Sequence, residues 1–339
     1  MSERLIVIEP GPPAKVALVV DGRLEDLLVD PSDGAPQMEE IHLVRVRRVI
    51  PKQGAAHVKL IDGKGFLRDA ADVKEGDLVL AQVSGMAEPG KGVPMTARRL
   101  HRGRYAILTP HAPGVNVARS IKDAEESARL TAIAAPLIGD GGVILRSAAR
   151  DIDDETIAED IADLMRVEEA VMAEGAPGLL AEAPGAEVFA WREWGDPDEV
   201  IREEGAFDRL GLWDAIDEAR GAKARLPSGG WMSIEPTTAL VAVDVNTGAD
   251  MSANAAANAN LSACKDLPRQ LRLRGLGGQI TVDFAPMRKN DRKAVEAALR
   301  KALKDDPIQT TLAGWTPLGH FELLRKRERR PLTEVLKDG

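Results

Sequence analysis

Short apolar runs separated by turn residues dominate the first hundred positions of the chain. Residues 4–8 and 15–20 flank a Pro/Gly segment and predict a hairpin, and a third strand-like run follows the Asp21-Gly22 turn. From about 38 to 103 several more short runs recur at close intervals, with glycine-containing turns between them and no helical stretch. This spacing predicts a small antiparallel barrel.

The hydrophobic period then changes. Residues 122–137 and 152–174 carry apolar side chains at helical spacing, and 141–148 between them is typical of a buried strand, so this part predicts an α/β unit. Residues 176–200 hold three prolines and several glycines, which favours a loop-rich connector. Residues 207–220 predict a helix.

After the Pro-Ser-Gly-Gly turn at 227–230, strand and helix patterns alternate, which predicts a layered α/β domain. The expected strands cover 232–235, 237–245, 278–284 and 308–312, and the expected helices 253–274, 290–305 and 318–328.

Composition limits the class of protein. A chain of 339 residues with 44% hydrophobic residues suggests two or three soluble domains, and the low aromatic content of 3% leaves Ala, Leu and Val to fill the cores. No apolar stretch has the length of a membrane span and the N-terminus lacks a secretory pattern, so a cytoplasmic location is expected. The one cysteine, Cys264, excludes an intrachain disulfide and a multi-cysteine metal cage.

The net charge of −9 argues against a protein that coats DNA, but local basic runs leave nucleic acid open as a ligand. Each run is either a solvated face or part of a phosphate-binding surface. The runs are RVRR at 45–48, RRLHRGR at 98–104, RQLRLR at 269–274 and RKRERR at 325–330.

Two familiar types of site are rejected. Gly85–Gly92 nearly spells a phosphate-binding loop, but Gly92 replaces the Ser or Thr and Pro94 opposes a following helix, so the segment predicts a hairpin turn with Lys91 exposed. The five histidines show no metal-ligand spacing, and Cys264 is interpreted as a buried structural thiol.

Two aspartates interrupt apolar strands near their ends. Strand alternation places Asp244 and Asn246 on one face of the first strand, and Asp283 ends the second. Carboxylates at corresponding ends of neighbouring strands can ligate Mg²⁺, which keeps most of its waters. The alternative, that each aspartate caps a helix or pairs with an arginine, stays open on spacing alone.

Three segments of the chain together resemble the catalytic core of the ribonuclease E/G family. They are 226–248 (LPSGGWMSIEPTTALVAVDVNTG), 260–284 (NLSACKDLPRQLRLRGLGGQITVDF) and 316–332 (TPLGHFELLRKRERRPL), and the last of them matches the family's closing helix. The resemblance implies an α+β/α/β multidomain chain. An OB-fold barrel would be inserted in a ribonuclease-H-like part, and a layered deoxyribonuclease-I-like α/β catalytic domain would follow. The implied divisions are 1–37 for the first ribonuclease-H-like strands, 38–102 for the RNA-binding barrel, 103–175 for a 5′-end sensor, 176–225 for a shortened ribonuclease-H-like connector and 226–339 for the catalytic domain.

The same resemblance implies roles for particular residues. Asp244 and Asp283 would be magnesium ligands, and Asn246 would orient an aspartate or the scissile phosphate. The residues implied to bind a 5′-monophosphate are Gly103, Ile107, Arg119, Arg146 and Ser147, and those implied to bind RNA in the barrel are His57, Phe66 and Lys91. A core position inside the barrel is the alternative for Phe66.

Several residues depart from the family pattern. His57 stands where an aromatic residue is usual and Ser262 where a glutamate is expected, and Pro268 lies inside the arginine-rich helix, where it should introduce a kink. The segment between Asn246 and Asn260 is shortened. The Cys-Pro-x-Cys zinc link is missing, so neither zinc nor a zinc-joined tetramer is expected.

The expected function is that of a magnesium-dependent endoribonuclease, with Mn²⁺ as a possible substitute, that cleaves single-stranded RNA to 5′-phosphate and 3′-hydroxyl ends in RNA processing or decay. A homodimer is expected from the family, and neither a membrane nor a long scaffold for other decay enzymes is expected as a partner. The alternatives are a noncatalytic RNA-binding relative and, less favoured, a phosphodiesterase acting on DNA.

Overall fold

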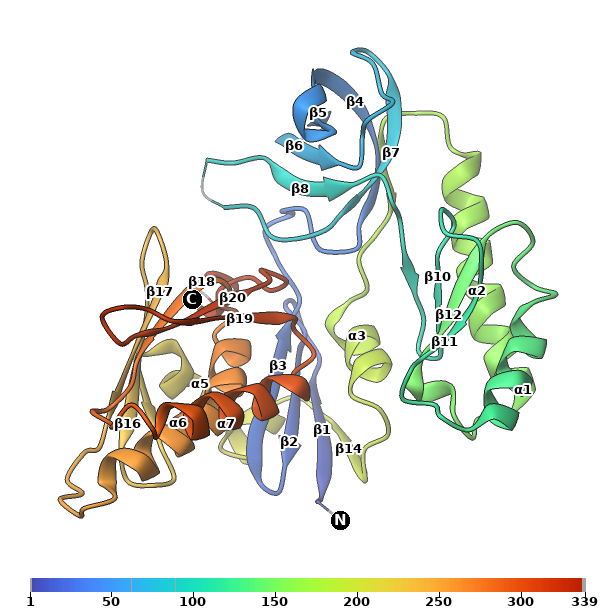
Figure 1. Ribbon diagram of the computed structural model, residues 1–339. Coiled ribbons are helices and arrows are strands. Elements are labelled where there is room, and N and C mark those ends of the chain that lie inside the picture. The colour runs from blue at the N-terminus through green and yellow to red at the C-terminus, as the bar shows by residue number, and fades with distance from the viewer. Residues whose placement is uncertain (1, 62, 89, 337–339) are drawn as a thin grey trace. The chain divides into compact units, whose positions relative to one another are not determined.

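The computed structural model describes residues 2–61, 63–88 and 90–336 (Figure 1). Its contacts divide the chain into two compact units. Unit 1 comprises Met1–Asp33 and Pro197–Gly339, and unit 2 comprises Gly34–Asp196. Among the described residues, no helix combines the length and the apolar character needed to cross a membrane.

Unit 1 begins with a four-stranded sheet in the order β14-β1-β2-β3. The hairpin expected in the first twenty residues is present as β1 (Arg4–Glu9) and β2 (Lys15–Val20), followed by β3 (Arg23–Val29). β14 (Glu199–Arg202) adds to β1 in parallel. The sheet buries its apolar side chains against α4 (Ala206–Arg209), α5 (Leu212–Arg220) and α8 (Leu332–Val335).

The second sheet of unit 1 has six strands in the order β15-β16-β17-β18-β20-β19. Only β17 (Val241–Asn246) and β18 (Gly278–Asp283) pair in parallel, because α6 (Ala255–Leu273) crosses over between them. The outer strands are β15 (Lys223–Arg225), β16 (Trp231–Pro236), β19 (Thr310–Trp315) and β20 (Phe321–Arg325), and α7 (Arg292–Lys304) follows β18.

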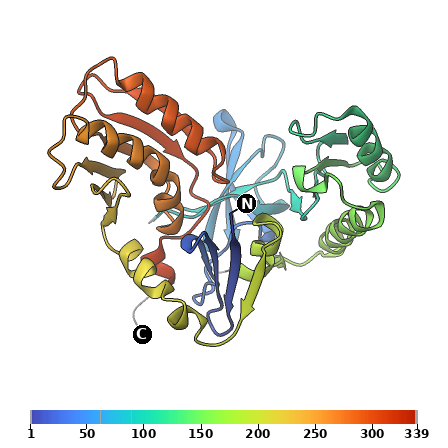
Figure 2. The ribbon, with the colours of Figure 1, turned by 90° about the horizontal axis from the view of Figure 1, so that it is seen from below.

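One face of this sheet is apolar and covered, and the other is polar and open. Val243, Val245 and Val282 point to the covered face, where Val295 and Leu299 of α7 and several α6 residues complete the core. Figures 1 and 2 show α6 and α7 lying along that side. The alternate positions, including Ala242, Asp244 and Asp283, are exposed, so the alternation expected for these strands is confirmed.

The helix predicted for 318–328, and with it the match to a closing helix, is wrong. Residues 321–325 form β20, in which Phe321, Leu323 and Arg325 are buried and the two residues between them are not. That period of two is the period of a strand. The turn between β19 and β20 contains Gly319 at φ +99°, a conformation that ends the first strand and starts a hairpin.

Two other predictions need correction in detail. The segment 176–200 is not mainly loop, because it contains β13 (Gly178–Ala181), α3 (Ala186–Glu193) and the start of β14. The helix expected at 207–220 is divided into α4 and α5, since Gly211 at φ +65° interrupts it. α6 runs continuously from Ala255 to Leu273 with Pro268 inside it.

The barrel expected between 38 and 103 is confirmed in unit 2. Its strands are β4 (Ile41–Ile50), β5 (Ala55–Leu60), β6 (Gly63–Arg68), β7 (Leu78–Val83) and β8 (Val93–Thr96). Pairing of β4 with β7 closes the five strands, which is compatible with an OB-fold, and β13 extends the sheet at β4. The near-phosphate loop at 85–92 connects β7 to β8, as predicted, although Pro89 within it lies outside the described residues.

A second sheet in unit 2 has the order β11-β12-β10-β9. Its strands are β9 (His101–Arg102), β10 (Ala106–Leu108), β11 (Gly114–Val117) and β12 (Gly142–Leu145). Apolar residues of α1 (Ala124–Ala134) and α2 (Asp154–Ala173) pack against it, which confirms both predicted helices and the strand between them.

Candidate functional site

Asp244 and Asp283 are brought together at the open face of the six-stranded sheet. They are register partners at the ends of the parallel strands β17 and β18, so both carboxylates project to the same side. Adjacent strands lie about 4.8 Å apart, which places the two side chains within reach of one ion. Both residues are exposed, and within the described part of the chain neither caps a helix or pairs with an arginine.

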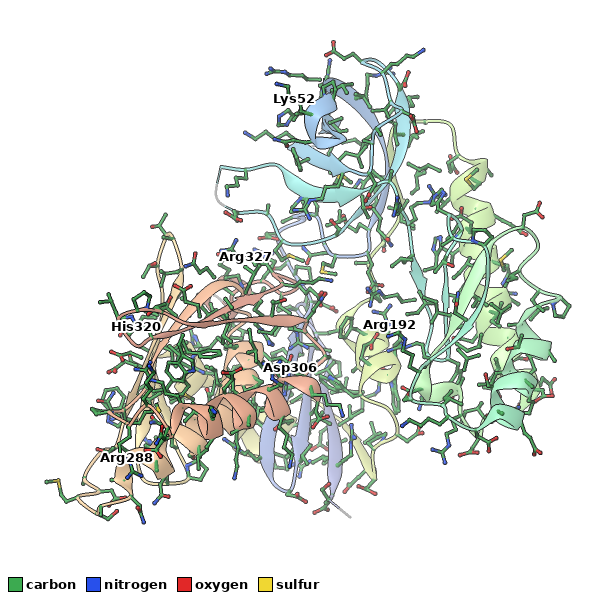
Figure 3. The ribbon with its side chains drawn as sticks, in the orientation of Figure 1. Lys52, Arg192, Arg288, Asp306, His320 and Arg327 are labelled. Carbon is green, nitrogen blue, oxygen red and sulfur yellow. The ribbon has the colours of Figure 1, made fainter. Side chains whose placement is uncertain are left out.

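Two further polar side chains adjoin the aspartates. The Asn246 amide donates a hydrogen bond of 2.8 Å to Oδ2 of Asp244, which fixes the orientation of that carboxylate. His320, in the turn before β20, lies with its Nε2 3.8 Å from Oδ2 of Asp283 (Figure 3). No local signal pointed to His320, because the β18–β20 pairing brings it to Asp283 from 37 positions away in the chain.

The donor chemistry of this cluster fits Mg²⁺. This ion is commonly held by one or two carboxylates, while waters and substrate oxygens complete its shell. The described residues contain no group of three or more His, Cys, Asp and Glu side chains arranged as a metal site. A site here would therefore depend on the two aspartates and leave most positions around the ion open.

Most arginines of the basic runs at 269–274 and 325–330 are neither a solvated face nor a phosphate-binding surface. Arg272 and Arg325 are buried and share the Asp306 carboxylate, at 2.7 Å and 3.0 Å (Figure 3). Arg329 binds the buried Asp26 of β3 through both carboxylate oxygens. These two runs connect the N-terminal sheet to α6 and the C-terminal segment.

The same packing explains the glycines that follow α6, among them Gly278 of the Leu-Gly-Gly motif. A Cβ on Gly275 would lie 1.9 Å from the carbonyl oxygen of Arg330, and one on Gly278 would lie 2.3 Å from the Arg327 guanidinium. Both glycines also have positive φ, at +65° and +93°. Only glycine allows the segment after β20 to pass this close to the turn before β18.

The outer surface of the barrel brings two of its three predicted RNA-binding residues together. His57 of β5 and Phe66 of β6 are cross-strand partners, with ring centroids 5.7 Å apart in an edge-on arrangement. Phe66 is half-buried between the fully inward Gly65 and Leu67, so it is not a core residue of the barrel. Lys91 is exposed, as expected, and pairs with Glu88 in the loop after β7.

The cationic surroundings of these rings come from the first basic run. Arg45, Arg47 and Arg48 of β4 are exposed, and Arg48 is the register partner of His57. Lys59 and Lys64 are likewise exposed partners on β5 and β6. Aromatic rings within a cationic surface suit a single-stranded nucleic acid, since bases stack while phosphates contact cations.

Arg146, implied to hold a phosphate, is engaged by this chain's own carboxylate. Its guanidinium donates to the Gly103 carbonyl at 2.7 Å and forms a two-point ion pair with Glu193 of α3. Burial raises the pKa of Glu193, but Arg146 and Arg192 outweigh that effect and hold the pKa below its ordinary value. Arg192 continues the network to Glu39 at 2.7 Å (Figure 3).

The other residues implied to bind a 5′-phosphate differ in their exposure and contacts. Gly103 packs so closely on Asp160 of α2 that a Cβ would lie 2.4 Å from its Oδ2. Asp160 also accepts the backbone N–H groups of 104–106, at 2.9–3.1 Å. Ile107 is half-buried on β10, while Arg119 and Ser147 are exposed. The sequence alone gave no sign of Glu193 and Asp160, because the residues that they contact lie 47 or more positions away in the chain.

Cys264 is a buried thiol inside α6, as predicted, and burial raises its pKa to about 12. A thiol with such a pKa stays protonated at neutral pH and is a poor nucleophile.

A carboxylate pair on an open sheet face, together with a closed five-stranded barrel, defines the chain as a mixed α/β protein. The family model of the Ribonuclease E/G family matches residues 101–200 and 195–328. The chain belongs to the ribonuclease E/G family.

Individual relatives are similar in sequence to this chain over nearly its whole length. It is 31% identical to Ribonuclease E of Nostoc sp. over its full length, and 29% identical to Ribonuclease E of Synechocystis sp. over 99% of it. It is also 29% identical over 99% of its length to Ribonuclease G of Salmonella typhimurium. The chain spans 58% of each of the two Ribonuclease E proteins and 82% of the Ribonuclease G.

Proposed function

We propose that this protein is a magnesium-dependent endoribonuclease that cleaves single-stranded RNA. The observation that carries the proposal is the register pairing of Asp244 and Asp283 on an open polar face, in a member of a ribonuclease family. The relatives are ribonucleases by name, and the rings and cations of the barrel suit the same substrate class.

Asp244 and Asp283 are the residues that would hold the ion, and Asn246 keeps the Asp244 carboxylate in one orientation. A bound divalent ion lowers the pKa of water and neutralises charge on a phosphoryl oxygen. His320 borders the pair and limits how a phosphodiester approaches from the β20 side. Hydrolysis at this site would yield 5′-phosphate and 3′-hydroxyl ends.

In this proposal the barrel binds the single-stranded RNA. Bases stack on Phe66 and His57, and the exposed arginines of β4 contact the backbone. Binding should weaken as salt rises, because phosphate contacts release counterions.

The proposed 5′-end site centres on Arg146. A 5′-monophosphate offers the same two-point acceptor geometry as the Glu193 carboxylate, so it would have to displace Glu193 to bind. Ser147 and Arg119, both exposed, supply further donors beside it.

The test is cleavage of a fluorescent single-stranded RNA with Mg²⁺ or with EDTA. We expect metal-dependent cutting that falls at least about 10²-fold in Asp244→Asn and in Asp283→Asn, since each removes a charged ligand. Glu235→Gln is the matched control, because Glu235 is exposed on the neighbouring strand β16 but is not a register partner of either aspartate.

Intact RNA binding without cutting by the wild type would contradict the proposal and favour a noncatalytic RNA-binding protein. Equal cleavage of a matched single-stranded DNA would instead favour a general phosphodiesterase.

A further inference from the structure

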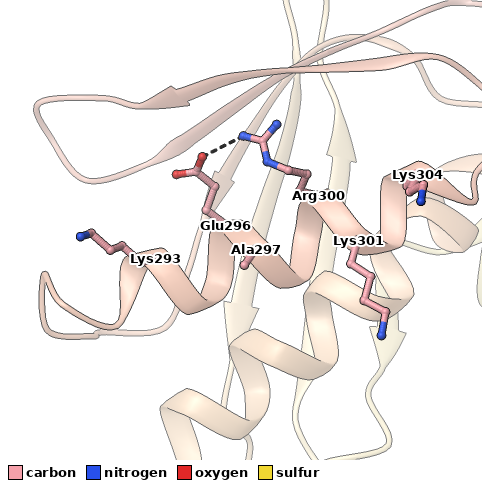
Figure 4. A pocket seen from close by; sticks show the side chains of 6 residues that line it. All are labelled: Lys293, Glu296, Ala297, Arg300, Lys301 and Lys304. Atoms are coloured by element: carbon pink, nitrogen blue, oxygen red, sulfur yellow. Dashed lines mark hydrogen bonds and ion pairs between the residues drawn. The ribbon is translucent and has the colours of Figure 1, made fainter.

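The outward side of α7 carries a row of cations that the proposed reaction does not use. Val295 and Leu299 of this helix face the core of the sheet. The opposite side lines a shallow, open pocket (Figure 4), whose lining residues are Lys293, Glu296, Ala297, Arg300, Lys301 and Lys304.

The spacing of these residues makes the row continuous. Positions 293, 297, 300/301 and 304 recur at intervals of three and four, so they form one stripe on the helix. From Lys293 to Lys304 the stripe is about 16 Å long. Ala297 lies in its middle with a side chain of one carbon, so an extended ligand can lie close to the helix between flanking cations.

The charge of the stripe is not balanced by the protein. Glu296 pairs with Arg300, at 3.0 Å, but Lys293, Lys301 and Lys304 form no ion pair with any described residue. Over residues 288–304 there are seven basic and two acidic side chains, within a chain whose net charge is −9. The buried arginines of the same unit, such as Arg272 and Arg325, are paired with carboxylates.

Helix stability does not account for the whole stripe. Lys301 and Lys304 lie in or near the last turn, where cations are favoured by the helix dipole. Lys293 lies in the first turn, where the dipole favours acidic residues, and that turn contains none. A cation there is unfavourable for the helix, so stability gives no reason for it.

We propose that this stripe binds the phosphate backbone of an RNA segment that lies outside the cleavage site. The inference rests on the proposed ribonuclease function, which supplies RNA as the polyanion. α7 covers the face of the sheet opposite to Asp244 and Asp283, so the two surfaces cannot contact the same few nucleotides. At about 3.4 Å per stacked nucleotide, the stripe accommodates about five phosphates.

The experiment compares two double variants in the full chain. Lys293→Gln with Lys301→Gln removes two charges from the stripe, and Lys122→Gln with Lys265→Gln removes two exposed lysines elsewhere. Glutamine and lysine have similar helix propensities, so folding should be retained, and circular dichroism checks it. Affinity for a long single-stranded RNA with a 5′-hydroxyl end is measured by fluorescence anisotropy in EDTA over a range of salt.

For single strands the slope of log K against log salt is about 0.7 per phosphate contact, so the stripe variant should lose about 1.4 from its slope. The control should keep the wild-type slope. Cleavage of a short RNA in Mg²⁺ should be equal in all three proteins, while cleavage of the long RNA should slow at low substrate concentration only in the stripe variant.

An unchanged slope in the stripe variant, or an equal loss in the control, would overturn the inference even if cleavage is normal. Binding of an acidic protein in place of RNA by the stripe would overturn it too. A wild type that binds RNA but cleaves neither substrate would refute the proposed function. The anisotropy measurement would still test whether the stripe binds RNA.

Discussion

At the scale of single residues, the contact between Arg146 and Glu193 determines how the proposed 5′-end site behaves. Arg146 is one-fifth exposed and already holds a carboxylate in the two-point geometry that a phosphate would take. In the proposed site a 5′-phosphate would have to compete with that carboxylate, so this contact would set the strength of end discrimination.

Replacing the competing acid tests this directly. Glu193→Gln should raise the ratio of cleavage rates for 5′-monophosphate over 5′-hydroxyl RNA by about 3- to 10-fold, since a neutral amide binds the guanidinium less strongly. Arg146→Gln should bring the ratio close to one. The exposed Glu159 provides a control, and Glu159→Gln should leave the ratio unchanged. A ratio that moves in neither test variant would remove Arg146 from the site.

At the scale of elements, the junction between β9 and α2 depends on a half-buried carboxylate. Glu168 of α2 accepts hydrogen bonds from Arg99 at 2.6 Å and from His101 at 2.7 Å. Burial raises the pKa of Glu168, but these two partners outweigh it and lower the pKa to about 2. The basic run at 98–104 is therefore partly internal.

The sign of the pH dependence follows from that pKa. Because the folded-state pKa lies below the ordinary value of 4.5, the stabilisation is complete above about 4.5 and is lost as pH falls toward about 2. Glu168→Gln should lower the free energy of unfolding by about 2 kcal/mol at neutral pH and by much less near the acid end of that range. Urea unfolding at both pH values measures this, with the exposed neighbour variant Glu169→Gln as control. An equal loss at both pH values would contradict the charge-based explanation.

At the scale of the whole chain, the arginine-rich segments fasten its early and late parts into unit 1. Arg272 of α6 contacts Glu25 and Asp26 of β3 as well as Asp306, and Arg325 of β20 contacts the same Asp306. The Asp306 side chain is only 1% exposed. Residues nearly three hundred positions apart thus share one buried ionic network.

Neutralising the centre of that network should be costly. Asp306→Asn leaves one of two buried guanidinium groups facing an amide N–H₂, so the free energy of unfolding should fall by about 3–5 kcal/mol. Asp305→Asn, at the exposed adjacent position, should change it by less than about 0.5 kcal/mol. Chemical denaturation of both variants makes the comparison, and similar losses in the two would show that the network contributes little.

The sequence by itself determined the features that depend on local periodicity and on short motifs. These include the barrel, the helices α1, α2, α6 and α7, the alternation that exposes Asp244, and the family resemblance that the family match confirms. Period and turn chemistry are local properties, so they can be recognised without a structure. The helix predicted at 318–328 is wrong because an arginine-rich segment with a mixed pattern was assigned without knowledge of the sheet that it joins.

Only the tertiary structure decided which charged residues face solvent and which face one another. The runs at 269–274 and 325–330 look like surface charge in the sequence, yet Arg272 and Arg325 are buried against Asp306. The stripe on α7 has a similar composition and remains exposed. The physical reason is that an ion pair between distant segments depends on strand register and chain crossing, and composition encodes neither.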